Sequence, residues 1–314
     1  MSDQWLRKVG LIVSAGSDGL DLSTLRIKFK NNQWDLTDST PNFTIIRVYN
    51  LSDDTAKSVQ KEFNAVTLQA GYEGGNYGVI FSGTIKMVRR GRENPTDTYL
   101  DILAADGDIG RNFGIVNKSL AAGATAKQQL DASVSAMNLP AGYTPDLPPA
   151  ALSRGKVLFG MARDRMDDVT ATANCNWSIQ NGKVVVLPLT GYLPGDAVVL
   201  TSNTGMVGLP EQTEDGIQVK IQLNPRIKIG GLVQINNKSI QRAFLGGQNL
   251  FATGRLETLP GLLPKVTDDG FYRVYVAEHS GDSRGPGSSE WYSDLTCLAI
   301  DSSAPAATAV QANG

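Results

Sequence analysis

Short runs of alternating or β-branched apolar residues dominate the first hundred positions of the chain. We interpret six of them as strands: residues 9–14, 25–30, 43–51, 65–72, 78–88 and 98–106. Glycine, aspartate and asparagine cluster between these runs, for example in Gly74-Gly75-Asn76. Runs of this length with such punctuation predict antiparallel β-structure.

One helix is predicted within this region, directly after the strand that ends at Leu51. Ser52 is a favourable N-cap residue, and two aspartates follow it in the first turn. Ala56, Val59 and Phe63 recur at helical spacing. We therefore expect residues 1–105 to form a β-barrel domain crossed by one short helix.

The pattern becomes mixed over residues 106–204. One helix is predicted to begin near Thr125, and a second over residues 161–174. Two apolar runs then flank Asn181-Gly182, which is the strongest short turn signal in the chain and predicts a β-hairpin. Two helices and a hairpin predict a small α/β module.

Strand patterns return over residues 205–301. The runs are residues 216–223, 230–236, 271–279 and 294–301, with a long glycine-containing connection over 246–269. Residues 302–314 lack the apolar content needed for packing and predict a disordered tail. The predicted fold class is mainly β with a smaller α/β part (α+β), in which two β-barrel domains flank the module.

Composition narrows the classes of function. The formal charge of the 314-residue chain is only −2, so no global charge favours nucleic-acid wrapping or an anionic membrane. No apolar run approaches the roughly 20 residues that span a bilayer, and the N-terminal run is too short for a signal peptide. The two cysteines, Cys175 and Cys297, lie far apart and are interpreted as free buried thiols in a reducing compartment.

Sequence motifs for metal or nucleotide chemistry are incomplete. One histidine and two distant cysteines do not supply the roughly four ligands of a structural zinc site. A calcium-loop-like start at Asp106 fails, because Arg111 stands where the loop needs glycine and Asn117 where it needs glutamate. Gly155-Lys156 lacks the rest of a phosphate loop. We predict no catalytic residue, no metal and no cofactor.

His279, the only histidine, stands between Glu278 and Asp282. Alternation places His279 at the end of a strand, before a loop rich in glycine, serine and proline. A catalytic histidine needs a nucleophile and an orienting acid brought together by the fold, and adjacency in sequence provides neither. We therefore assign His279 a structural or interface role.

A basic run lies near another predicted hairpin turn and contains Lys86, Arg89, Arg90 and Arg92. One interpretation is a solvated tip that resists edge-to-edge pairing. The other is a docking surface for an acidic partner or passing DNA.

The order of several segments resembles baseplate hub proteins of contractile-tailed phages. The first is the strand–Asn-Leu-Ser–helix passage FTIIRVYNLSDDTAKSV, followed by VTLQAGYEGGNYGVIFSGTI. The others are NWSIQNGKVVVLP, GLPEQTEDGIQVKIQLNPRIKIGGLVQI and GFYRVYVAEHSGDSRGPGSSEWYSDLTCL. The similarity covers nearly the whole chain except its C-terminal tail.

This resemblance implies a structural role. Hub subunits form a homotrimer in which each chain contributes two tube-like β-barrel domains, so that the ring has pseudo-six-fold symmetry. The ring joins the tail tube protein to the spike protein within the baseplate and contacts other baseplate proteins. The genome or the tape-measure protein passes through its lumen. The implied location is the virion tail baseplate, assembled in the host cytoplasm.

We take charged and aromatic residues near two hairpin ends as partner-binding candidates. They are Lys86, Arg89, Arg90, Arg92, His279, Asp282, Arg284 and Trp291. Two other classes of function remain open. One is a tail-associated peptidoglycan hydrolase using Glu278, Glu290 and His279, and the other is a monomeric carbohydrate-binding module using exposed tryptophan and tyrosine side chains.

Overall fold

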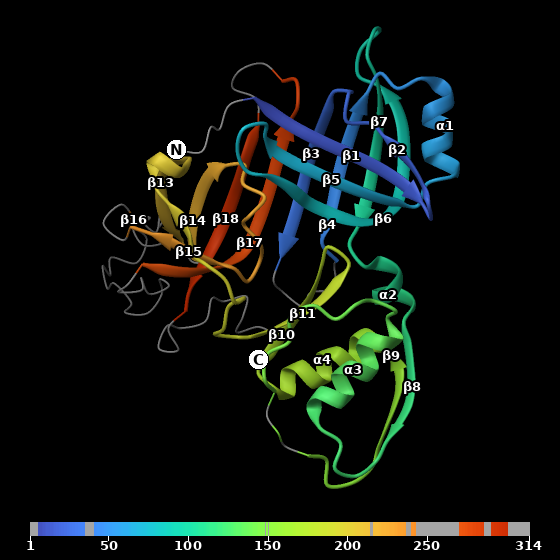
Figure 1. The fold of residues 1–314 in the computed structure, drawn as a ribbon, viewed down its shortest axis with the longest axis vertical. Coiled ribbons are helices and arrows are strands. Elements are labelled where there is room, and N and C mark those ends of the chain that lie inside the picture. The colour runs from blue at the N-terminus through green and yellow to red at the C-terminus, as the bar shows by residue number, and fades with distance from the viewer. Residues whose placement is uncertain are drawn as a thin grey trace, which may run out of the picture.

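The computed structural model describes residues 6–34, 41–147, 149, 151–213, 216–236, 240–242, 270–285 and 290–300. The expected connection at 246–269 and the expected tail at 302–314 lie outside these residues. The described chain has three parts: an N-terminal sheet, a C-terminal sheet beside it, and a module with helices below both in the view of Figure 1.

The N-terminal part confirms the six predicted strands and the predicted helix. Its elements are β1 (Arg7–Ala15), β2 (Asp18–Asp21), β3 (Ile27–Trp34), β4 (Phe43–Tyr49), α1 (Asp53–Lys61), β5 (Ala65–Tyr72), β6 (Tyr77–Arg92) and β7 (Thr98–Ala105). Ser52 caps α1, where its side-chain oxygen accepts a hydrogen bond from the Thr55 backbone N–H at 3.2 Å. Ala56 and Val59 of α1 are buried in the same core as the strands.

The strands of this part follow the order β3-β4-β7-β6-β5-β1-β2. Inward residues of six strands and of α1 share one hydrophobic cluster, so the sheet curls around a common core. The described strand pairs do not close this sheet into a barrel. The mainly-β fold class is confirmed, whereas the expected closed barrels are not found among the described strands.

The middle part confirms the predicted helices and hairpin. It contains α2 (Asp108–Phe113), β8 (Ile115–Leu120), α3 (Ala126–Ala136), β9 (Lys156–Met161), α4 (Ala162–Thr172), β10 (Cys175–Gln180) and β11 (Lys183–Pro188). A capping box formed by Thr125 and Gln128 starts α3. Asn181 and Gly182 both have positive φ, at 51° and 76°, as the tight turn between β10 and β11 requires.

The aspartates of the rejected calcium loop have structural partners. The Asp106 carboxylate accepts hydrogen bonds from the backbone N–H groups of Asn181 and Gly182, which fastens the hairpin tip to the end of β7. Asp108 forms an ion pair with Lys86 Nζ at 2.6 Å. These contacts attach the module to the N-terminal sheet.

The C-terminal part contains the four predicted strands together with shorter elements that the pattern did not indicate. It consists of β12 (Val198–Leu200), the 3₁₀ helix η1 (Ser202–Thr204), β13 (Met206–Thr213), β14 (Gly216–Gln222), β15 (Leu232–Ile235), β16 (Gln241–Arg242), β17 (Phe271–Asp282) and β18 (Trp291–Ala299). Strand β17 continues to Asp282, so His279 lies within a strand and not at the start of a loop.

The two sheets join through strands that are far apart in sequence. Strand β17 pairs antiparallel with β3, from Val276 opposite Trp34 to Asp282 opposite Lys28. Leu223 and Trp291 of the C-terminal part belong to the core cluster of the N-terminal part. The halves therefore share one continuous sheet, and two residues of the C-terminal part pack in the N-terminal core.

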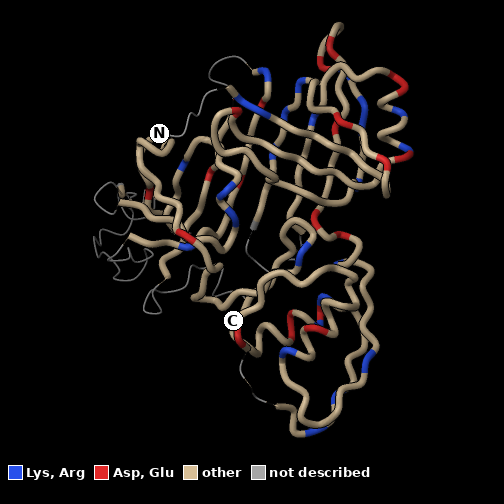
Figure 2. Tube along the Cα trace, viewed as in Figure 1, with Lys and Arg blue, Asp and Glu red and all other residues tan. Residues whose placement is uncertain are grey.

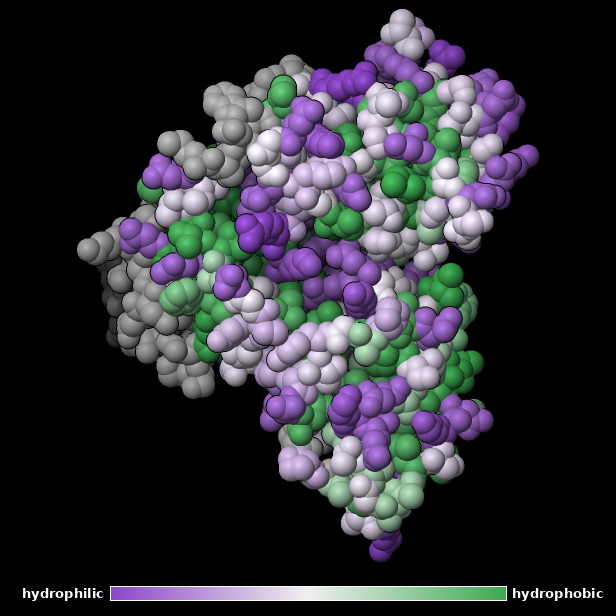
Figure 3. Space-filling model, viewed as in Figure 1, coloured by the Kyte–Doolittle hydropathy of each residue, from purple (hydrophilic) through white to green (hydrophobic). Residues whose placement is uncertain are grey.

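Charged and apolar residues are distributed differently over the surface. Both signs of charge occur in each of the three parts (Figure 2). Hydrophobic residues gather at the right-hand edge of Figure 3, at the level where Figure 1 shows α2 and β8. Within the described residues, no helix combines the length and apolar character needed to cross a membrane.

Candidate functional site: the open face and free edges of the sheet

Eight strands form an alternating antiparallel sheet in the order β13-β14-β18-β17-β3-β4-β7-β6. Successive side chains on a strand point to opposite faces. One face packs on the two hydrophobic cores, and the other is open. Side chains on the open face form rows across the strands, such as Lys220, Asp294 and Glu278 on β14, β18 and β17.

Opposite charges compensate one another along this open face. Lys220 lies 3.5 Å from Asp294, and Lys30 lies 3.9 Å from Glu278. On the N-terminal half, Asp101 lies 2.7 Å from Arg47 Nε and 3.2 Å from Arg89. The hydrogen bond to Asp101 is the main cause that raises the pKa of Arg47 above its usual range. Ion pairs of this kind add little to the stability of the fold. They do leave the open face of the sheet without a large excess of positive or negative charge.

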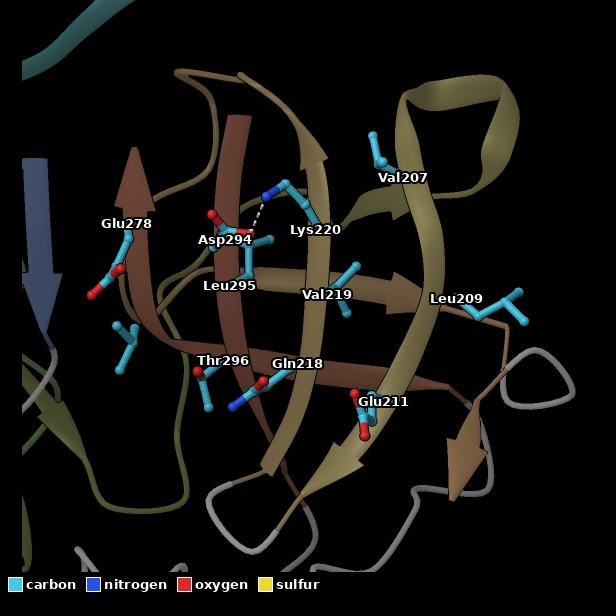
Figure 4. A pocket seen from close by; sticks show the side chains of 11 residues that line it. Val207, Leu209, Glu211, Gln218, Val219, Lys220, Glu278, Asp294, Leu295 and Thr296 are labelled. Carbon is cyan, nitrogen blue, oxygen red and sulfur yellow. Dashed lines mark ion pairs between the residues drawn. The ribbon is translucent and has the colours of Figure 1, made fainter. Parts of the chain in front are cut away.

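A hollow of about 440 Å³ occupies the C-terminal half of the open face. Figure 4 shows its floor formed by β14, β17 and β18, with Lys220 directed toward Asp294 and Glu211 and Leu209 along β13. The described residues contain no group of three or more His, Cys, Asp or Glu side chains that could hold a metal ion. The hollow is the concavity of a curved sheet lined by residues of both charges.

Each end of the eight-stranded sheet has an unpaired segment. Strand β6 pairs with β5 over residues 77–84 and with β7 over residues 84–92, so residues 86–92 have no described strand on their second edge. At the other end, β13 pairs with β16 only at Glu211 and Gln212, which leaves the second edge of residues 206–209 without a described strand. Free edges of this kind are templates for pairing with another chain.

The predicted basic run lies within β6 and not at the hairpin turn that follows it. Three of its four residues form ion pairs. Arg89 contacts Asp101 on the open face, Lys86 contacts Asp108, and Arg90 contacts Asp53. Arg92 donates a hydrogen bond to the Pro95 carbonyl at 3.0 Å. The run therefore lies along the free edge of β6, with most of its charge compensated inside the chain.

His279 occupies the opposite, buried face of the sheet. Its side chain is 1% exposed, and its Nδ1 lies 2.7 Å from the Ser293 hydroxyl oxygen. Burial lowers the pKa of His279 to about 4, so the imidazole is neutral near pH 7. Across the strands, His279 faces Asn31 on β3, which in turn faces Thr44 on β4. These buried residues form a polar row across the junction of the two halves.

Asp282, Arg284 and Trp291 also lie at this junction. Asp282 forms a two-contact ion pair with Arg26, with nitrogen–oxygen distances of 2.7 and 3.2 Å. Burial would raise the pKa of Asp282, but hydrogen bonds from Arg26 and from the Arg284 backbone hold it below its usual range. The Arg284 guanidinium donates to the Thr24 carbonyl. Trp291 is 2% exposed, and its ring lies edge-on to that of Phe29 at 5.7 Å.

With the sheet and its edges described, the chain can be compared with known proteins. Residues 41–241 match the family model described as baseplate hub gp41, and this segment is more than half of the chain.

The chain belongs to the baseplate hub gp41 family.

Solved tail proteins share the fold. The 43 kDa tail protein of prophage MuSo2 from Shewanella oneidensis aligns with a TM-score of 0.57 and 8% identity, covering 96% of this chain and 99% of that one. A tail protein from Neisseria meningitidis MC58 aligns with a TM-score of 0.53 and 8% identity, covering 93% and 96%. A comparison with curated proteins gave no match.

A secretion protein has the same fold. The E. coli c3393 protein, a component of the type VI secretion system described as structurally similar to the T4 phage tail proteins gp27 and gp5, aligns with a TM-score of 0.53. Its identity to this chain is 9%, and the alignment covers 94% of this chain and 79% of that one. The family and the shared fold support a structural role in a phage tail.

The hydrolase candidates in this hub family member are not brought together by the fold. Glu278 points to the open face toward Lys30, whereas the neighbouring His279 points into the core. The Glu290 side chain is exposed, and this residue lies immediately before the first residue of β18. The predicted cluster of acid and imidazole is therefore divided between the two faces of the sheet.

Aromatic side chains for a sugar-binding surface are also mostly inside. Trp177 and Trp291 are buried, as are Tyr49 and Tyr72. Tyr77 is partly exposed on β6, where its hydroxyl donates to Gln69 Oε1 at 2.8 Å. The buried rings contribute to the cores and the junction.

Two buried polar residues that connect different parts of the chain were missed from the sequence. Asn31 continues the inward phase of Ile27 and Phe29 on β3, and its amide donates to the Ile80 carbonyl at 2.8 Å. Arg273 is 3% exposed, and its Nη1 lies 2.9 Å from each of three backbone carbonyls between residues 188 and 191. For Asn31 the available signal was a polar residue in the inward phase of an apolar strand. Arg273 lies on the opposite face of β17 from its core neighbours Tyr272 and Val274, so its burial could not be predicted from the strand pattern.

Proposed function

We propose that this chain is a structural hub subunit of a phage tail baseplate. Three copies form a ring with pseudo-six-fold symmetry that joins the tail tube to the spike and lets the genome pass. The family match and the tail-protein fold support the role. The expected division at residues 105, 204 and 301 fits this plan, because two sheet halves per chain give six around a three-fold axis.

The observation that carries this proposal is the eight-stranded sheet with a free segment at each end. Its strands alternate in direction, so β6 and β13, at opposite ends of an even-numbered series, run in opposite directions. When β6 of one copy meets β13 of the next, they are antiparallel and the alternation continues without a break. Head-to-tail contacts of this kind close into a ring when the rotation between copies allows it.

In this ring the open face lines the lumen. Side chains of both signs lie close together on it, as Lys220 with Asp294 and Lys30 with Glu278 illustrate. A wall with compensated charge releases few counterions on contact with DNA and does not hold the passing polyanion or the tape-measure protein. The basic residues Lys86, Arg89, Arg90 and Arg92 lie at the seam between copies, and the buried group of His279, Asp282 and Trp291 holds the two halves of each copy at the angle that the ring needs.

Disulfide trapping across the two edges tests this proposal. Arg89→Cys is combined in one chain with Val207→Cys or Leu209→Cys, because these residues lie on the same open face and two registers must be sampled. In tails assembled with these chains, oxidation should give a ladder on non-reducing gels that stops at the trimer. The native Cys175 and Cys297 are buried and do not interfere.

Arg89→Cys with Ile12→Cys is the matched control, because Ile12 lies on β1, outside the eight-stranded series. It should give monomers only. Monomers from both edge pairs in assembled tails, or a ladder that continues past three chains, would show that the ring is not built in this way.

A further inference from the structure

The middle module carries a ridge of apolar side chains that are mostly exposed in the described chain. The ridge consists of Ile109 and Phe113 on α2, Ile115 on β8, and Val157 and Phe159 on β9, which are 61%, 72%, 62%, 67% and 69% exposed. Figure 3 shows hydrophobic residues along its right-hand edge, at the level where Figure 1 shows α2 and β8.

The register of β8 and β9 explains why the ridge points outward. Val116 and Leu158 face inward, where they are buried against α3 and its neighbours. Their sequence neighbours Ile115, Val157 and Phe159 therefore lie on the outer face of this two-stranded sheet. Asn117 and Ser119 share this outer face, so it is mixed and not wholly polar, whereas the solvent-facing side of an antiparallel sheet is commonly polar.

The size of the ridge indicates a covered surface. Five large side chains at this exposure present roughly 600 Å² of apolar area. This is at the upper end of the roughly 300–600 Å² for the largest patch on a typical monomer. It is smaller than the roughly 800 Å² per partner of a stable interface, so the ridge needs an adjoining contact to form one.

The adjoining contact is the free edge of β6. Helix α2 packs against β6, and the ion pair between Asp108 and Lys86 joins them at the point where the unpaired segment of β6 begins. Met87, the next residue of that segment, is 54% exposed and lies on the open face together with Arg89. Figure 1 shows α2 and β8 directly below β6 on the same flank of the molecule.

We propose that the ridge is a second contact between neighbouring copies and is covered by the next copy in the ring. This inference rests on the proposed function, because the neighbour that pairs with β6 is the one placed over the ridge. A head-to-tail contact requires a different surface on the other flank. A hollow of about 210 Å³ lies there beside β15, with Leu193, Val198, Ile227 and Leu232 in its walls. Phe113 or Phe159 of one copy fills this hollow in the next.

The double variant Phe113→Ser/Phe159→Ser tests the energetic part. Both residues are exposed in the single chain, so the melting temperature of the double variant should stay close to that of the unchanged protein. Loss of two aromatic anchors should reduce assembly of the chain into tails on the order of 100-fold. Ile12→Ser is the matched control, because it removes an exposed apolar side chain outside this flank and should assemble normally.

Cross-linking in assembled tails separates this inference from the ring itself. Phe159→Cys with Leu193→Cys should join neighbouring copies, alongside the edge pair Arg89→Cys with Leu209→Cys. If the edge pair forms trimers while the flank pair does not and the serine variant assembles normally, the ridge contact is refuted and the ring stands. If neither pair joins copies, the ring itself is refuted. Cross-links from Phe159→Cys to a different baseplate protein would also overturn the assignment to a second copy.

Discussion

Replacement of Trp291 by alanine is expected to lower the free energy of unfolding by about 3–5 kcal/mol. Trp291 is 2% exposed, and although it begins β18 its ring belongs to the core of the N-terminal part. It lies edge-on to Phe29, and the Arg7 guanidinium lies 5.6 Å from its ring centroid. Gly281 leaves room for both rings, since a Cβ there would lie 2.5 Å from Phe29. The substitution thus leaves a cavity where the two halves of the sheet meet.

Trp177→Ala is the matched control for this prediction. Trp177 is equally buried, but it packs in the core of the middle module. Denaturant unfolding should show a large loss for both variants. Hydrogen exchange should differ: Trp291→Ala should speed amide exchange in β3 and β17, and Trp177→Ala should speed it in β10 and α4. Unchanged exchange in β3 and β17 of the Trp291 variant would show that this ring does not hold the junction.

Local pattern predicted most elements of the N-terminal part because its strands alternate cleanly and its helix has a cap. The same reasoning predicted the hairpin at Asn181-Gly182 and the helix start at Thr125, where one or two residues determine the backbone. It did not predict β8 and β9, because Ile115, Val157 and Phe159 on the outer face are as apolar as the inward residues and weaken the alternation that marks a half-buried strand.

The pairing of β17 with β3 could not be predicted from the sequence, for a different reason. The paired residues are separated by more than two hundred positions, and no local periodicity records which distant edges meet. The same limit applies to the candidate site. Sequence reasoning found Asp282 and Trp291, but their partners Arg26 and Phe29 come from the other half of the chain. It also found the basic run without the acidic residues that compensate it.

Two buried titratable groups at the junctions of the chain should act on stability with opposite signs between about pH 4 and 7. Burial lowers the pKa of His279 from 6.5 to about 4 in the folded chain. The stability contributed by the neutral imidazole is complete above pH 6.5 and is lost as the pH falls toward 4. With 1.36 kcal/mol for each pKa unit, the loss amounts to about 3 kcal/mol. The chain has one histidine, so this effect belongs to a single residue.

Asp106 opposes this effect. Burial raises its pKa from 3.8 to about 7, although two backbone N–H groups donate to its carboxylate. The protonated carboxyl is favoured in the folded chain, so the stability that it contributes is complete below pH 3.8 and is lost as the pH rises through 7. The free energy of unfolding of the unchanged protein should therefore depend only weakly on pH in this range. The stability lost through one group as the pH changes is offset by the stability gained through the other.

Single substitutions separate the two titrations. His279→Gln should make the free energy of unfolding rise as the pH is lowered from 7 to 4.5, because only Asp106 still titrates with a large shift in this range. Asp106→Asn should make it fall by up to about 3 kcal/mol over the same range, because only the buried imidazole remains. Denaturant unfolding at half-unit pH steps measures both slopes, and the difference between the variants does not depend on the fixed cost of either substitution. Equal slopes in the two variants would mean that neither group is buried as the structure describes, and that the polar row under the sheet junction is open to water.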